Sequence, residues 1–326
     1  MSVRNKGRCL AAPYAIYSTA MTSKRPIRSI FYTALLCVLG LGVLWAGVAA
    51  HAQDGATPTP DPDAIVARAR EIDLSAYPVV PQPTARTYEI FQQGQALGRA
   101  PNVLSKVGDC NSVAWIFLYP FGEDQYDLGD YAELQETVDF FRNSFTQRSH
   151  AANNGLNVYA VLDPLWADAA ACESGETPLA CEYRLRNPSV AVIMFGTNDM
   201  LVLTPQQFDA GLRRVVEETA QAGVIPVLST FPRNLSYPER SVLFNQIVVR
   251  VALDEDVPLI NLWLALEPLP AHGVDEDGFH LNGPLTRAGD FASADNLRTG
   301  HPLRNLVTLQ TLDVLRREVL QAPARP

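Results

Sequence analysis

Three short groups of polar residues have the types and the order that covalent acyl chemistry requires. They are Gly108-Asp-Cys-Asn-Ser112, Gly196-Thr-Asn-Asp199 and Asp277-Gly-Phe-His280. A nucleophile needs a base to take its proton, and the base needs an acidic partner that fixes its tautomer. The oxyanion that develops during the attack needs hydrogen-bond donors. Together the three groups supply all four functions.

The first group offers two candidate nucleophiles. Cys110 is the stronger candidate, because a thiol beside the imidazole of His280 ionises more readily than a hydroxyl. Ser112 ranks below it, because the start of a helix would point its side chain elsewhere. A third interpretation is that Cys110 is a small, inert residue in a chain without catalysis. His280 is the candidate base, Asp277 its orienter, and Asn198 an oxyanion donor together with the backbone N–H of Cys110.

Strand and helix patterns alternate along residues 64–326, which we predict to form one domain. Apolar runs predict strands, and the spacing of apolar residues or their flanking caps predict helices. The predicted strands are 103–107, 157–162, 189–195, 224–229 and 258–263, and the predicted helices 130–141, 204–222, 238–252 and 302–320. This alternation is typical of a parallel sheet with helices on both faces, in which ligands bind beyond the carboxyl ends of the strands.

In these three groups the chain resembles the SGNH (GDSL-type) hydrolases. That family carries Gly-Asp-Ser after its first strand, Gly-x-Asn-Asp after a central strand and Asp-x-x-His near the C-terminus. The resemblance implies a flavodoxin-like three-layer α/β/α sandwich. It also assigns catalytic roles to Cys110, which replaces the family serine, and to Asn198, Gly196, Asp277 and His280.

The resemblance further implies hydrolysis of an ester of a small molecule, a carbohydrate or a lipid, without a metal or another cofactor. The family also has a glycine in a second block that donates to the oxyanion, and the candidate segments for it are 144–150 and 163–166. The exchange of serine for Cys110 leaves a second function open, in which the same fold is a non-catalytic ligand-binding module.

The N-terminal segment has the pattern of an export signal. Lys24, Arg25 and Arg28 precede an apolar run over residues 30–50, and Ala50-His-Ala52 follows it. This pattern predicts a signal peptide that is cleaved after Ala52, and therefore a secreted protein. Since the run is long enough to span a bilayer, the alternative is a membrane anchor formed by residues 30–50. Residues 53–63, rich in Pro, Thr and Asp, are predicted to be a linker.

The cysteines remaining after export are few enough to assign. Cys172 and Cys181 bracket a short loop that contains Gly and Pro, and we predict a disulfide between them in an oxidising compartment. This pairing leaves Cys110 as an unpaired thiol once residues 1–52 are removed. The spacing of His150, His272 and His301 from Cys, Asp and Glu does not indicate a metal site.

The net charge of the chain argues against two kinds of partner. Residues 53–326 carry 20 Lys and Arg against 35 Asp and Glu, which is a net charge of −15. A chain this acidic repels the phosphate backbone of nucleic acids and the surface of anionic lipids.

Overall fold

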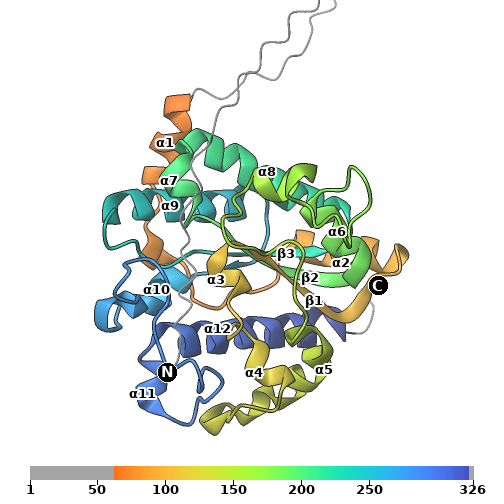
Figure 1. Ribbon diagram of the computed structural model, residues 1–326, viewed down its shortest axis with the longest axis vertical. Coiled ribbons are helices and arrows are strands. Elements are labelled where there is room, and N and C mark those ends of the chain that lie inside the picture. Colours follow the sequence, from red (N-terminus) through yellow and green to blue (C-terminus); the bar gives the residue numbers. More distant parts are fainter. Residues whose placement is uncertain (1–61, 323–326) are drawn as a thin grey trace, which may run out of the picture. The chain divides into compact units, whose positions relative to one another are not determined.

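Four parallel strands form the centre of the fold (Figure 1). The computed structural model describes residues 62–322, which fall into one compact unit. The strands are β1 (Ala100–Gly108), β2 (Pro188–Met194), β3 (Ile225–Ser229) and β4 (Leu259–Ile260), neighbours in that order. Every residue of β2 is buried, which explains why its sequence is apolar at nearly every position.

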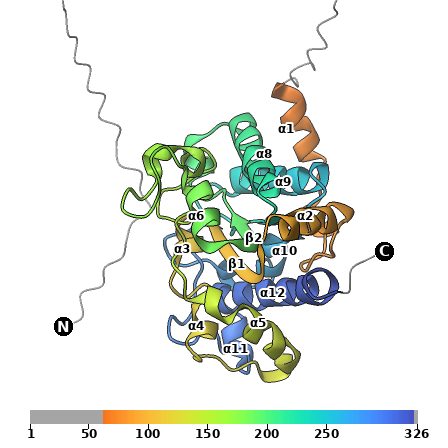
Figure 2. The same cartoon turned by 90° about the vertical axis from the view of Figure 1, so that its right-hand side faces the viewer.

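Helices cover both faces of the sheet, so the predicted three-layer α/β/α sandwich is confirmed. Figures 1 and 2 show α8 (Pro205–Gln221) and α9 (Pro238–Asp254) on one side and α5 (Gln135–Phe145) and α12 (Gly300–Leu315) on the other. The remaining helices are α1 (Pro62–Arg70), α2 (Ala85–Ala96), α3 (Cys110–Val113), α4 (Tyr119–Gly122), α6 (Pro178–Arg186), α7 (Asp199–Val202), α10 (Leu262–Leu266) and α11 (Ala294–Leu297). A π-helical turn, Arg316–Leu320, continues α12.

Aromatic side chains mark the core between each helical layer and the sheet. The rings of Phe208 on α8 and Phe244 on α9 stack with centroids 4.9 Å apart. On the other side, Phe121 on α4 meets Phe145 on α5 edge to face, at 6.0 Å. All four rings are fully buried, and their burial stabilises each helix pair against the sheet.

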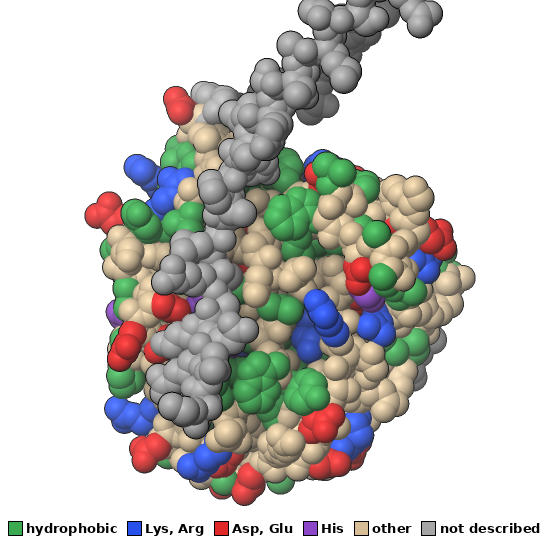
Figure 3. All heavy atoms as spheres, in the orientation of Figure 1, with side chains coloured by type: hydrophobic (Ala, Val, Ile, Leu, Met, Phe, Trp, Pro, Cys, Tyr) green, Lys and Arg blue, Asp and Glu red, His purple; other side chains and the backbone are tan. Residues whose placement is uncertain are grey.

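Opposite charges on the surface are paired in several places. Arg213 on α8 bonds to Asp209 on the same helix at 2.9 Å, and to Asp254 and Glu255 at the end of α9 at 2.8 and 3.3 Å. On the face that Figure 3 shows, Asp and Glu side chains are interspersed with Lys and Arg. The excess of negative charge is therefore not gathered into one patch on that face.

A fifth strand is reduced to a single bridge beside β1. The backbone N–H of Gly108 donates to Ala151 O at 3.1 Å, and Asn153 N–H donates to Gly108 O at 3.2 Å. These bonds form an isolated parallel bridge between Gly108 and Ala152. When Ala152 is counted as the second strand in chain order, the sheet has the spatial order 2-1-3-4-5 of flavodoxin-like folds.

The strand predicted at 157–162 is wrong. This segment contains a 3₁₀ turn, Ala160–Leu162. The side chain of Asn157 accepts hydrogen bonds from the backbone N–H groups of Tyr159 and Ala160, and Val158 N–H donates to the buried carboxylate of Asp199. Because these side chains occupy the backbone donors, the segment folds as a turn in spite of its apolar residues.

Two other predicted elements differ from the structure at their ends. The strand predicted at 258–263 is only two residues long, because Asn261 accepts from Leu264 N–H and so caps α10. The helix predicted from residue 130 starts as a 3₁₀ helix, Gly129–Leu134, before α5. By contrast, the start of α8 is as predicted, because Thr204 and Gln207 form a reciprocal capping box.

The N-terminal predictions lie outside the described residues, except for the end of the linker. Helix α1 begins at Pro62, so the last two residues of the predicted linker 53–63 are already helical. The signal peptide, its cleavage after Ala52 and the alternative anchor at 30–50 fall before residue 62. Over residues 62–322, no helix combines the length and apolar character needed to cross a bilayer.

The predicted disulfide between Cys172 and Cys181 is confirmed, with an S–S distance of 2.06 Å. It ties the loop before α6 to the middle of that helix. We expect the Cys172→Ser/Cys181→Ser double variant to lose up to about 3 kcal/mol of unfolding free energy, because the bridge closes only a short loop. Urea denaturation measures the loss, and the wild type in a dithiol reductant is the control. An unchanged denaturation midpoint in the double variant would contradict the expectation.

Candidate active site

The first polar group follows β1 directly and forms the start of α3. Asp109 is the N-cap, and its carboxylate accepts from Asn111 N–H at 3.1 Å. Gly108 has a φ of 149°, and a Cβ there would lie 2.2 Å from Met194 O, so only glycine fits. This tight exit places Cys110 as the first residue of α3, with a side chain that is buried.

Ser112, the alternative nucleophile, faces the interior. Its side chain is 1% exposed, and its hydroxyl accepts a hydrogen bond from the Arg304 guanidinium at 3.4 Å. The same hydroxyl would be 2.5 Å from a Cβ at Gly108, behind the strand exit. The Ser112 side chain therefore lies between the strand exit and Arg304.

Asp277 and His280 form a close pair on one loop. His280 Nδ1 and Asp277 Oδ2 are 2.6 Å apart, and the other carboxylate oxygen accepts from the backbone N–H groups of Phe279 and His280. Partial burial alone would raise the pKa of Asp277, but the hydrogen bonds from His280 and Phe279 bring it below its usual value. The carboxylate is therefore ionised and fixes the orientation of the imidazole.

Contacts between loops bring the three groups together. Leu281, the residue after His280, donates its backbone N–H to Asn111 Oδ1 at 3.4 Å. The Asn111 amide donates to Thr197 Oγ1, also at 3.4 Å. Segments separated by about eighty residues or more thus meet at the carboxyl ends of the strands, where α/β sheets bind ligands.

The second group is held by a buried carboxylate. Asp199 accepts from Gly196 N–H and from Val158 N–H, each at 2.9 Å, and burial raises its pKa to about 7. The N–H of Gly196 is therefore engaged, and the glycine itself makes room for the Phe231 ring, which would be 2.1 Å from a Cβ. Asn198 is half-buried, and its amide donates to Leu156 O at 3.1 Å.

Sequence reasoning missed the loop that Asn198 contacts. This loop, 153–156, follows the one-residue bridge at Ala152 and contains Gly155 with a φ of 83°. It lies between the two segments considered for the second-block glycine, 144–150 and 163–166. The sequence does contain a signal for this loop, because Asn-Asn-Gly is a strong turn pattern. It is easily missed, because the strand before it is reduced to one bridged residue.

Cys110 belongs to the disulfide-bonded cysteines of the structure. The unpaired thiol is predicted for the chain without residues 1–52, and it stays a prediction. The prediction rested on a count that assigned Cys9 and Cys37 to a segment lost on export. In the full-length chain, the sulfur of Cys110 must be released by a reductant before it can act as a nucleophile.

One cluster in the described part of the chain has metal-ligand types. The ligand atoms of His150, Cys172 and Cys181 lie within 4.8 Å of one another. Metal binding needs the thiolate form, and here both sulfurs are bonded to each other. The cluster therefore lacks the ligands for a metal while the disulfide is intact.

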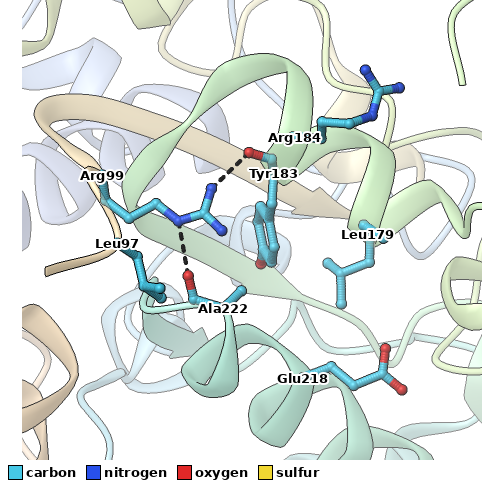
Figure 4. A pocket seen from close by; sticks show the side chains of 8 residues that line it. Leu97, Arg99, Leu179, Tyr183, Arg184, Glu218 and Ala222 are labelled. Atoms are coloured by element: carbon cyan, nitrogen blue, oxygen red, sulfur yellow. Dashed lines mark hydrogen bonds between the residues drawn. The ribbon is translucent and has the colours of Figure 1, made fainter. Parts of the chain in front are cut away.

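A cavity of about 460 Å³ lies away from the polar groups (Figure 4). Arg99, which precedes β1, and Ala222, which precedes β3, place it at the amino ends of the strands. The Arg99 guanidinium donates to the backbone carbonyls of Ala222 and Tyr183, each at 2.8 Å, as Figure 4 shows. Because Arg99 is engaged in these bonds, its contribution here is structural.

Comparisons with known proteins agree with the sequence motifs. Residues 140–284 match the family model of the GDSL-like lipases/acylhydrolases, a range that includes Asn198, Asp277 and His280 but not Cys110. No curated protein sequence matches the chain.

Several solved structures are similar in fold. A psychrotrophic esterase, EstA from Pseudoalteromonas sp., is 17% identical, with a TM-score of 0.42 over 65% of this chain and 96% of that one. A lipase/acylhydrolase from Enterococcus faecalis is 16% identical, with a TM-score of 0.44 over 65% of this chain and 95% of that one. A catalytic mutant of Axe2, an acetylxylan esterase from Geobacillus stearothermophilus, is 15% identical, with a TM-score of 0.39 over 64% and 93%.

Proposed function

Since this chain carries a GDSL-like lipase/acylhydrolase domain of the SGNH type, we propose that it is an exported esterase that forms an acyl-enzyme on Cys110. The observation that carries the proposal is the 2.6 Å pair of Asp277 and His280, on a loop bonded through Leu281 to the helix of Cys110. The disulfide between Cys172 and Cys181 supports export, because such bonds form in oxidising compartments.

In the chain that still carries residues 1–52, catalysis begins after a dithiol has reduced the disulfide of Cys110. His280 takes the thiol proton, and the thiolate attacks the ester carbonyl to form a carbon–sulfur bond and an oxyanion. The tetrahedral intermediate then collapses, and the protonated His280 gives its proton to the departing alcohol. Water attacks the thioester with His280 as the base, which releases the carboxylic acid and restores the thiol. Asp277 holds the imidazole in one tautomer throughout.

The oxyanion is stabilised by donors from two loops. We assign this role to Asn198, whose amide carries a second N–H besides the one donated to Leu156 O, and to the backbone N–H of Cys110. We also assign the family's second-block glycine to Gly155, which precedes Leu156 and has the positive φ that favours glycine. The family implies a small-molecule ester as substrate. Within that class, the ester could be an acyl group on a carbohydrate or on a lipid.

The hydrolysis of a short-chain aryl ester by the reduced protein tests this function. We expect His280→Ala to lower kcat/KM at least about a hundredfold, because general acid–base catalysis contributes that much. His272→Ala is the matched control, since His272 lies earlier in the same region and its ring bonds to Glu267 in its own segment. Equal rates for His280→Ala and the wild type would contradict the proposal.

A second function is favoured by one specific observation. Cys110 lies outside the range that matches the family, and its sulfur is in a disulfide. A domain of this kind without catalysis would bind a ligand at the carboxyl ends of its strands. If the wild type is inert on a broad panel of esters, with and without a dithiol, this function replaces the esterase.

A further inference from the structure

A set of three buried polar side chains lies behind the candidate active site and has no part in the mechanism above. These are Asn111, His301 and Arg304, with exposed fractions of 1%, 8% and 2%. His301 and Arg304 are one turn apart on α12, and so share a face of that helix. Buried polar groups of this kind are costly unless they are fully bonded, so their bonding partners are informative.

Arg304 holds the backbone of the nucleophile helix. Its guanidinium donates to Asn111 O at 2.6 Å and to Ser112 Oγ at 3.4 Å, and it lies 3.6 Å from the centroid of the Phe117 ring. Burial lowers the pKa of Arg304 to about 9, while the charge of Asp109 opposes that shift. Arg304 is therefore still a cation at neutral pH, and its bonds are directed at α3.

The start of α12 holds the loop of His280. The Gly300 and His301 backbone N–H groups donate to the side-chain and backbone oxygens of Asn282, at 2.8 and 2.9 Å. The backbone of Leu281, directly after His280, acts on the His301 ring and opposes the fall of its pKa. Burial and the neighbouring charges lower the pKa of His301 to about 3, so the ring is neutral and adds no charge beside His280.

Asn111 joins both ends of this arrangement. Its Oδ1 accepts from Leu281 N–H and its Nδ2 donates to Thr197 Oγ1. One side chain therefore contacts both the loop that carries His280 and the turn that carries Asn198. A leucine side chain makes none of these bonds.

We propose that Asn111, His301 and Arg304 are positioning residues that use α12 as a common base to fix the separation between Cys110 and His280. Arg304 secures the nucleophile helix, His301 secures the base loop through its backbone N–H to Asn282 O, and Asn111 links the two directly. The kinetic part of this inference rests on the proposed esterase function. The separation between Cys110 and His280 matters because a displacement of about 1 Å between reacting groups costs up to roughly a hundredfold in rate.

The test compares Arg304→Met, Arg304→Lys and Asn111→Leu with a matched control, Arg316→Met. Arg316 is also buried at 6% exposure and follows the far end of α12, where it bonds to Thr137 and Asp313. Three quantities are measured on the reduced protein. They are kcat and KM for an aryl acetate, the rate of alkylation of Cys110 by iodoacetamide followed on its peptide by mass spectrometry, and the melting temperature.

We expect Arg304→Met and Asn111→Leu to lower kcat by roughly ten- to a hundredfold, with KM changed by less than about twofold. Alkylation of Cys110 should slow in the same variants, because its thiolate depends on the nearby imidazole. Arg304→Lys keeps the charge and N–H donors but loses the planar fork of the guanidinium, and should recover part of both rates. Arg316→Met should lower the melting temperature and leave both rates unchanged.

Several outcomes would overturn the inference. The first is that Arg304→Met has the same kcat and the same rate of Cys110 alkylation as the wild type. The second is that Arg304→Met and Arg316→Met lose both rates equally. If Arg304→Met does not fold, wild-type rates in Arg304→Lys and Asn111→Leu together have the same meaning. If the wild type does not hydrolyse esters but alkylation still slows in Arg304→Met and not in Arg316→Met, the esterase function fails and the positioning role is supported.

Discussion

Cys110→Ala is expected to hydrolyse an aryl acetate at least about a hundredfold more slowly than the reduced wild type, because covalent catalysis is lost with the sulfur. The measurement is kcat/KM after treatment with a dithiol, since the sulfur is in a disulfide in the full-length chain. Iodoacetamide should abolish the activity of the reduced wild type, with a single modification on the Cys110 peptide.

Cys110→Ser is the matched variant for this experiment. It places the family's own nucleophile beside the same Asp277–His280 pair and takes no part in a disulfide. We expect it to retain some activity that is the same with and without the dithiol, whereas the wild type should depend on it. If Cys110→Ala is as fast as the wild type and Ser112→Ala is inactive, the nucleophile is Ser112, although its hydroxyl is bonded to Arg304.

Gly196→Ala should have the largest effect on stability. A Cβ there would lie 2.1 Å from Phe231 Cε1, inside a fully buried ring, and the φ of 132° is strained for any other residue. We expect a loss of roughly 3 kcal/mol or more of unfolding free energy from the combined overpacking and backbone strain. Denaturant unfolding followed by circular dichroism measures it.

Gly175→Ala is the control for the backbone contribution alone. Gly175 also has a positive φ, 83°, but a Cβ added there would have no neighbouring atom within 4 Å. We expect it to lose about 1–2 kcal/mol, the cost of the left-handed conformation. Similar losses in Gly175→Ala and Gly196→Ala would show that Phe231 yields readily and that the close approach is unimportant.

The sheet could be predicted from the sequence because its central strand is apolar at nearly every position. β2 is buried on both faces, and its sequence is correspondingly apolar at nearly every position. The turn at 157–162 defeats the same argument, since Val158, Val161 and Leu162 are as buried there as they would be in a strand. What separates the two cases is the bonding of backbone N–H groups to Asn157 and Asp199, which an apolar pattern does not record.

In the candidate site too, local contacts could be predicted from the sequence and long-range contacts could not. The spacing of Asp277 and His280 is local, so the pair could be predicted from the sequence, and the structure shows it bonded. Arg304 and His301 belong to a helix whose sequence indicates mainly core packing, and their importance arises from contacts with residues up to 193 positions away.

The short strands at the two edges of the sheet affect the tendency of the protein to aggregate at high concentration. An open sheet edge offers unpaired donors and acceptors on which strands of another molecule can assemble, and this is a route to aggregation. Here β4 offers two residues before α10 begins, and the Ala152 bridge offers one. Behind that bridge, Ser144 Oγ accepts from Leu104 N–H and blocks the outer edge of β1. The described domain therefore presents little template for intermolecular strand addition.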